Sequence, residues 1–170
     1  EIGTMITHGA VEEPNPFVIT GIAGRLGFSV ISVEKAMMNG EVGFGRKVLQ
    51  AVEEFGLSFE HMPTGIDTMC VVLATAELEP VKEQLTRRIW ESTNPDTLTI
   101  HDNMGIIATV GRGMVHNPGT AARLFAALSR YHINVRMIDQ GSSELSILVG
   151  VDSGEFQQAI RAIYDEFVSE

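Results

Sequence analysis

The chain repeats itself at a constant spacing, and this repeat limits the folds that it can adopt. Residues 30–73 align without a gap on residues 106–149. The aligned identities include Met38 with Met114 and Gly43 with Gly119, and the apolar positions repeat as well. A match of this length indicates two copies of one structural unit.

Each copy shows the same order of hydrophobic periods. In the first copy, an apolar strand pattern at 28–33 precedes a helical stripe, which Gly56 ends as a C′ glycine. Strand patterns follow at 57–62 and 68–75, then a second helical stripe and a strand at 97–101. The stripes consist of Phe44, Val48, Ala51, Val52 and Phe55, and of Val81, Leu85 and Ile89. This β-α-β-β-α-β order predicts an α+β fold of two ferredoxin-like units, each an antiparallel sheet with two helices on one face.

The second copy lacks one strand. It shows strand patterns at 106–110, 133–138 and 145–151 and helical patterns at 121–128 and 156–167, whereas an extra strand pattern at 17–22 precedes the first copy. We therefore expect the first unit to be inserted into the second. The first domain would span 27–101, and the second would combine 17–23 with 104–170. Gly21, Gly24 and Gly27 predict a flexible joint, and residues 1–16 are expected to be the tail of a preceding domain and a linker.

Composition narrows the possible partners. The net charge is −10, and the 12 Lys and Arg residues form no basic stripe, so nucleic acid is not expected to bind. The chain has no run of about 18 apolar residues that would span a membrane. Its single cysteine, Cys70, suits a reducing cytoplasm and a place in the core. Neither a metal site nor an enzyme activity is predicted, since the histidines lack metal-ligand spacing and we find no nucleophile–base pair.

The loop before the first helix of each copy is a candidate site for a ligand that carries a carboxylate. Free backbone amides at a helix N-terminus can hold such a group, and Gly43 and Gly119 let the backbone approach it closely. The candidates are Met38, Gly43, Phe44 and Gly45 in the first copy and Asn117, Gly119 and Thr120 in the second. A structural interpretation stays open, in which these glycines only turn a strand into a helix.

Several motifs resemble the paired regulatory ACT domains of aspartate kinases. They are SVISVEK at 29–35, GFGRKVL at 43–49, SFEHMPTGIDT at 58–68 and INVRMIDQGSSE at 133–144. GTMI at 3–6 resembles the end of that family's kinase domain. The resemblance implies feedback control, by lysine, threonine or both, of aspartate phosphorylation in amino-acid biosynthesis. The motifs for ATP and Mg lie upstream in that family, so this chain is expected to hold no cofactor and no catalytic residue.

The resemblance adds a second group of candidate effector-binding residues. They are Ser58, Phe59, Glu60 and Asp67 in the first copy and Asn134, Val135 and Gln140 in the second. An acidic residue at the position of Glu60 meets an ammonium group in lysine-sensitive members, and we expect Glu60 and Asp67 to neutralise the two ammonium groups of lysine near the first loop. Arg136 occupies the matching place in the second copy, so the two copies cannot bind one ligand in the same way. That Glu60 is only a solvated strand residue stays open.

Assembly is the last expectation. Each unit leaves sheet edges and a sheet face uncovered, which predicts a homodimer through the ACT domains. The resemblance also implies contact with the kinase domain of the same chain. The alternative function is an oligomerisation module that binds no effector.

Overall fold

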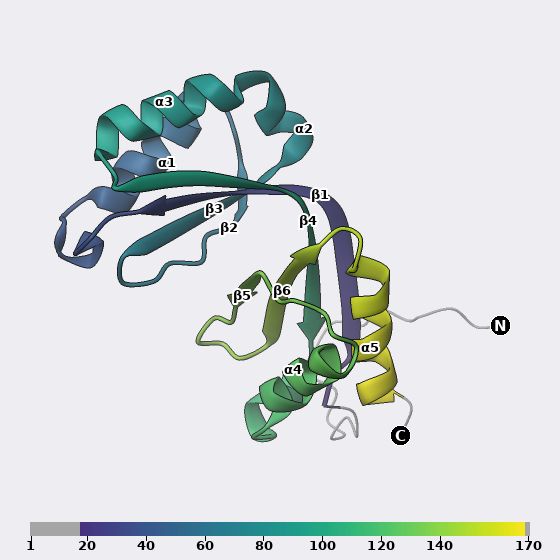
Figure 1. Cartoon of the computed structure of the whole chain (residues 1–170). Helices are drawn as coiled ribbons and strands as arrows, with labels where there is room; N and C mark the ends of the chain where they lie inside the picture. The colour runs from purple at the N-terminus through teal and green to yellow at the C-terminus, as the bar shows by residue number, and fades with distance from the viewer. Residues whose placement is uncertain (1–17, 169–170) are drawn as a thin grey trace, which may run out of the picture.

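The computed structural model describes residues 18–168, which form one six-stranded antiparallel sheet bent into two lobes (Figure 1). The strand order is β2-β3-β1-β4-β6-β5. Two long strands, β1 (Gly21–Glu34) and β4 (Thr97–Val110), run through both lobes. Helices cover one face of the sheet in each lobe. This is the predicted ferredoxin-like α+β architecture.

The first lobe follows the predicted order of elements. After β1 come η1 (Met38–Gly40), α1 (Phe44–Glu54), β2 (Phe59–His61), β3 (Thr68–Ala74), α2 (Thr75–Leu78), η2 (Glu79–Val81) and α3 (Lys82–Thr93). The stripe that predicted α1 is buried at Phe44, Val48 and Val52, because residues three to four apart share one helix face. Phe55, the last residue of that stripe, follows the helix as its C-cap.

The second lobe repeats the order after β4. It contains η3 (Arg112–His116), α4 (Thr120–Arg130), β5 (Met137–Asp139), β6 (Ser146–Asp152) and α5 (Phe156–Val168). The strand predicted at 133–138 is shorter than expected and begins at Met137. The same holds in the first lobe, where the strand predicted at 57–62 is reduced to β2.

The prediction of a flexible joint at Gly21, Gly24 and Gly27 is wrong. These glycines lie inside β1, whose residues pair with β4 from Gly21↔Val110 to Glu34↔Thr97. Ladder hydrogen bonds along both strands offset the conformational freedom of the glycines. Gly27 has φ of 89°, and the register shifts on both sides of Phe28 mark irregularities of the β-bulge kind, which bend a strand.

The first part of β1 completes the sheet of the second lobe. Gly21 to Leu26 pair with β4, and β6 pairs with the same part of β4 on its other side. The insertion topology requires this pairing. Phe17 lies outside the described residues, and residues 18–20 precede the strand. The division into two separate domains at the predicted bounds stays a prediction, because both lobes share one sheet.

Three apolar clusters form the core, one within each lobe and one between the lobes. One packs Ile31 and Leu73 against α1 and α3, and a second packs Ile107 and Val149 against α4 and α5. The third lies on the other face of the sheet and consists of Phe28, Val30, Val72, Met104, Ile106 and Met137. Because both lobes contribute to it, the sister unit covers part of the face that the helices leave open. Cys70 packs against this third cluster, and burial raises the pKa of its thiol.

A polar cluster ties the long strands to α3 near the bend. The buried Ser29 hydroxyl of β1 donates to Asp102 Oδ1 of β4 at 2.7 Å and lies 2.9 Å from Thr75 Oγ1. Lys82 Nζ donates to Asp102 Oδ2 at 2.7 Å. The Lys82 ammonium, followed by the Ser29 hydroxyl, holds the pKa of the Asp102 carboxyl below its ordinary value. The sequence analysis did not predict that these residues would form a cluster.

The helices α1 and α4 end in the same hydrogen-bonding motif with different residues. Gly56, with φ of 69°, donates its N–H to Glu53 O at 2.8 Å, and Leu57 donates to Val52 O at 3.2 Å. This is the Schellman geometry that a C′ glycine favours, as predicted. At the aligned position in the second lobe, His132 adopts φ of 56°.

Candidate functional site

The loop before α1 places its apolar candidates in the core. Met38 and Phe44 are 4% and 3% exposed, so their side chains anchor the loop to the hydrophobic core. Gly43 precedes the helix with φ of 82°, a left-handed conformation in which other residues are strained. Gly45 lies in the first turn of α1. The glycine-bearing turn predicted from the sequence is therefore present, and its backbone is the part that can meet a ligand.

Asp67 holds this loop in place. Its Oδ1 accepts a hydrogen bond from Met37 N at 2.8 Å, and its carbonyl accepts one from Lys35 N at 2.9 Å. Asp67 was expected near the loop and lies there. One of its carboxylate oxygens already binds the backbone, which leaves the other for a ligand.

An ion network beside the loop was missed by sequence reasoning. Glu41 accepts from Lys35 Nζ at 2.6 Å and from Lys47 Nζ at 2.7 Å, and the Lys35 ammonium lies 5.7 Å from the centre of the Phe44 ring. Lys35 first, and then Lys47, hold the pKa of the Glu41 carboxyl below its ordinary value. The three charged residues lie within one loop and the first turn of a helix. This short spacing in the sequence could have indicated the ion network.

Ser58, Phe59 and Glu60 lie away from the loop within one chain. Phe59 of β2 pairs with Leu73, near the end of β3, whereas Asp67 precedes the first residue of that strand. The six residue steps from Asp67 to Leu73 cover about 20 Å along a strand. The expectation that Glu60 and Asp67 meet near one loop is therefore not met inside a single copy. The physical reason is that β2 runs antiparallel to β3. The start of β2 therefore lies beside the end of β3, away from Asp67.

Glu60 instead forms an ion pair with Arg25 of β1, and both side chains are exposed. Ser58 and Phe59 are exposed as well. An exposed ion pair of this kind contributes about 0–1 kcal/mol, so Glu60 is free to exchange Arg25 for another cationic partner.

The second loop shares the left-handed glycine before its helix but satisfies its own polar groups. Gly119 precedes α4 with φ of 93°. The Asn117 amide donates to Gly113 O at 2.7 Å, and the Thr120 hydroxyl donates to Asn117 O at 2.8 Å. Both polar side chains that were expected to contact a ligand therefore cap the loop itself.

The other second-copy candidates lie elsewhere. Asn134 and Val135 line a hollow with His132 at the C-terminal end of α4, opposite the end that Gly119 and Thr120 begin. Gln140 lines a separate hollow between β5 and the 63–68 turn of the first lobe. The second copy thus does not gather its predicted residues into one site.

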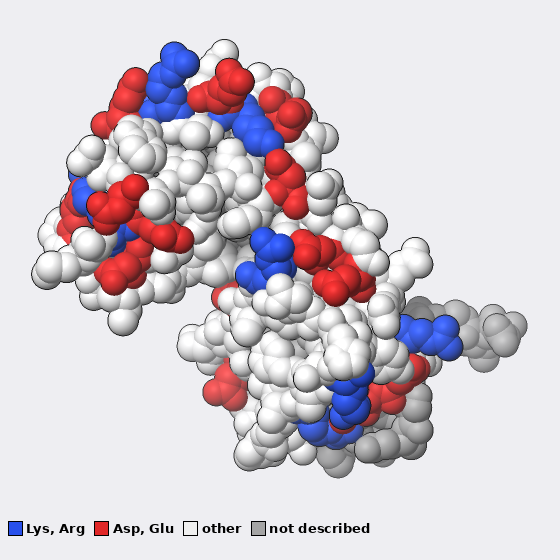
Figure 2. Space-filling view, viewed as in Figure 1, with Lys and Arg blue, Asp and Glu red and all other residues white. Residues whose placement is uncertain are grey.

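Charge and metal chemistry do not point to another site type. The face drawn in Figure 2 scatters Lys and Arg among Asp and Glu without a continuous basic surface. Within residues 18–168, no three His, Cys, Asp or Glu residues are placed to hold a metal ion. No helix in the same range is long and apolar enough to cross a membrane.

Comparison with known proteins shows what the chain is similar to. Residues 107–167 match the family model of the ACT domain. The chain is 42% identical over 150 residues to Aspartokinase 3 of Bacillus subtilis, a match that covers 88% of this chain and 33% of that protein. The crystal structure of the aspartate kinase of Clostridium acetobutylicum superimposes with a TM-score of 0.85 at 45% identity, over 95% of this chain and 36% of that one.

A third neighbour is regulatory over its whole length. The ligand-free regulatory subunit of aspartate kinase from Thermus thermophilus superimposes with a TM-score of 0.74 at 20% identity, over 88% of this chain and 99% of that subunit, which shows a shared fold. The chain spans about a third of the length of the two more similar proteins. The chain is thus homologous to part of the aspartokinases, and it has the fold of the regulatory subunit of an aspartate kinase.

Proposed function

We propose that this chain is the effector-binding regulatory part of an aspartate kinase and mediates feedback control of aspartate phosphorylation. The observation that carries the proposal is the geometry of the first loop. Gly43 adopts a left-handed conformation before α1, and the Asp67 carboxylate accepts a hydrogen bond from Met37 N at the start of the loop. This geometry offers helix amides to a carboxylate and a free carboxylate oxygen to an ammonium group. The kinase activity, with its ATP and Mg, would belong to another part of a cytoplasmic parent protein.

Lysine is the effector that we place first, with threonine second. Asp67 provides one acidic group at the loop, and Glu60 provides another at the far end of β2. Lysine carries two ammonium groups and would use both, whereas threonine carries one. Since one chain keeps these carboxylates apart, a complete lysine site would need Glu60 from a second copy beside the first loop.

Dimerisation is therefore part of the proposal. The outer strands β2 and β5 have only three residues each, and both expose a large apolar side chain, with Phe59 45% and Ile138 53% exposed. Edges this short limit backbone pairing, but the exposed apolar side chains on them favour contact with another copy. The same observation supports the alternative function, an oligomerisation module that binds no effector.

Calorimetric titration of this chain with lysine and with threonine, next to its mass in solution by light scattering, tests the proposal. We expect a dimer that binds lysine. Glu60→Gln should weaken lysine binding by about 1–3 kcal/mol, because a charge-assisted hydrogen bond is lost. Glu83→Gln, which removes one exposed acidic charge from α3, is the matched control and should bind as the parent does.

The outcomes separate the candidate functions. Binding of threonine alone, or unchanged lysine binding by Glu60→Gln, would show that the lysine assignment is wrong. A stable dimer that binds neither amino acid would leave the oligomerisation module as the function.

A further inference from the structure

The duplicated chain builds two related hollows at the junction of the lobes. The first, which we call the crease cavity, is lined by Val30, Ser32, Cys70, His101, Met104, Arg136 and Met137. The second is lined by Ala23, Gly24, Arg25, Phe28, Glu60, His61, Ile106, Ala108 and Leu148. The repeat aligns Val30 with Ile106 and Arg136 with Glu60, so each lobe presents the same positions to the sheet of the other.

The aligned positions differ in charge. Arg136 of the crease cavity corresponds to Glu60, which pairs with Arg25 in the second hollow, whereas Arg136 pairs with Asp152. The crease cavity contains no carboxylate among its lining residues. It is also smaller, about 130 Å³ against about 240 Å³. An anion in the crease cavity therefore meets no lining carboxylate, whereas an anion in the counterpart would meet Glu60.

Arg136 is the charged residue that lines the crease cavity. The Arg136 side chain is 33% exposed and is oriented by two neighbours. Its Nη1 donates to Asp152 Oδ1 at 3.1 Å, and its Nη2 lies 3.3 Å from His101 Nδ1. A guanidinium has five N–H donors, so these contacts hold Arg136 in position and leave donors for a ligand.

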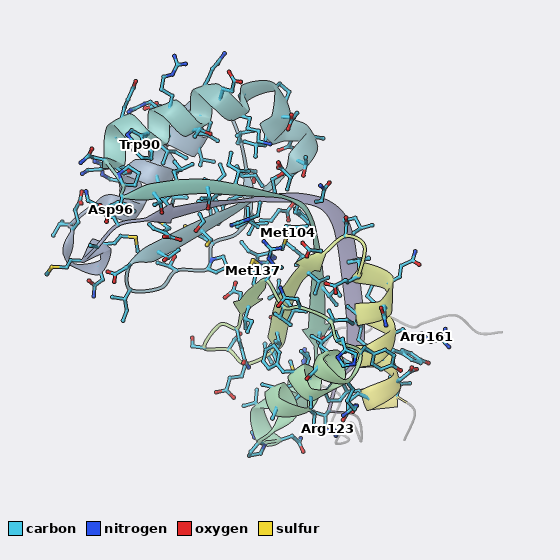
Figure 3. The ribbon with its side chains drawn as sticks, viewed as in Figure 1. Trp90, Asp96, Met104, Arg123, Met137 and Arg161 are labelled. Carbon is cyan, nitrogen blue, oxygen red and sulfur yellow. The ribbon has the colours of Figure 1, made fainter. Side chains whose placement is uncertain are left out.

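The floor of the cavity combines a hydroxyl with apolar side chains. Ser32 is 7% exposed, and its oxygen accepts a weak hydrogen bond from Cys70 Sγ at 3.8 Å. A hydroxyl that is buried without a strong partner favours a ligand that accepts its hydrogen bond. Met104 and Met137, 1% and 8% exposed, form the apolar part, and Figure 3 shows both at the junction between the lobes.

We propose that the crease cavity binds a small carboxylate with a short apolar chain, of about the size of butyrate. Arg136 and Ser32 hydrogen-bond the carboxylate, and Met104 and Met137 surround the chain. The volume suits this ligand, since an engineered cavity of about 150 Å³ holds benzene, which has as many heavy atoms as butyrate. This site is separate from the effector loops at Gly43 and Gly119.

Methionine-methyl NMR of the whole chain, labelled with ¹³C at the methionine methyl groups, tests the site with sodium butyrate as probe. We expect the Met104 and Met137 signals to shift in a saturable way, while Met38, beneath the effector loop, stays unchanged. Butyramide, which has the same shape without the charge, should bind at least tenfold more weakly. Arg136→Gln should weaken butyrate binding at least tenfold. Arg161→Gln, which removes an exposed charge from α5, should leave it unchanged (Figure 3).

A second variant tests the same site independently if Arg136→Gln disturbs the fold. Ser32→Ala removes the hydroxyl without adding bulk to the cavity and should also weaken butyrate binding. The proposal is overturned if Met104 and Met137 do not respond to butyrate, if butyramide binds as well as butyrate, or if Met38 shifts instead. A Met38 response would assign the carboxylate to the effector loop, so this test can fail without affecting the proposed function.

Discussion

His132 is strained at the end of α4, and replacing it with glycine should stabilise the chain. His132 adopts φ of 56° while its N–H donates to Ser129 O at 2.9 Å and Ile133 N donates to Leu128 O at 3.1 Å. A left-handed conformation costs an L-residue about 1–2 kcal/mol. Glycine removes this strain but costs about 0.4–1 kcal/mol through a more flexible unfolded chain. The expected net gain for His132→Gly is about 0.5–1 kcal/mol.

The repeat supplies the reciprocal experiment. Gly56 occupies the aligned position with φ of 69°, and a Cβ added there would meet no atom within 4 Å. Gly56→His should therefore cost about 0.5–1 kcal/mol through backbone strain alone. The two sites lie in different lobes, so the double variant should return close to the parent.

Urea unfolding followed by circular dichroism measures these differences. The three variants and the parent should order as His132→Gly, then the parent and the double variant, then Gly56→His. If His132→Gly is no more stable than the parent, the strain assigned to His132 does not exist. If Gly56→His is as stable as the parent, the motif does not require glycine.

Two further predictions concern the interior. Gly105→Ala should destabilise the chain by about 1–3 kcal/mol, because a Cβ there overlaps the Phe156 ring. Thermal unfolding measures this loss. When Phe156→Leu has removed the ring, adding Gly105→Ala should cost less stability than it does in the parent. The lowered pKa of Asp102 contributes stability that is fully present above its ordinary value of 3.8 and is lost as the pH falls through the lower folded value. Asp102→Asn should therefore reduce stability at neutral pH and flatten the loss of stability in acid, and an equally steep acid loss in urea titrations would contradict the role of Lys82.

The candidate sites show where local reasoning stops. Gly43 and Gly119 were identifiable because a left-handed turn before a helix depends on a few adjacent residues. The separation of Glu60 from Asp67 was not, since it depends on the direction of β2 against β3. The pairing of Glu60 with Arg25 joins residues 35 positions apart, and no local pattern records it.

The sequence by itself determined the duplicated unit, the order of its helices and strands and the two helix loops, because these follow from hydrophobic period and glycine position over short segments. Only the tertiary structure decided that Gly21, Gly24 and Gly27 lie in one long strand, since pairing with β4 on both sides of the irregularity at Gly27 holds the strand together. It also decided that Ser32 and Arg136 face one cavity. Residues more than 100 positions apart meet there because the shared sheet bends and turns the faces of its two lobes toward each other.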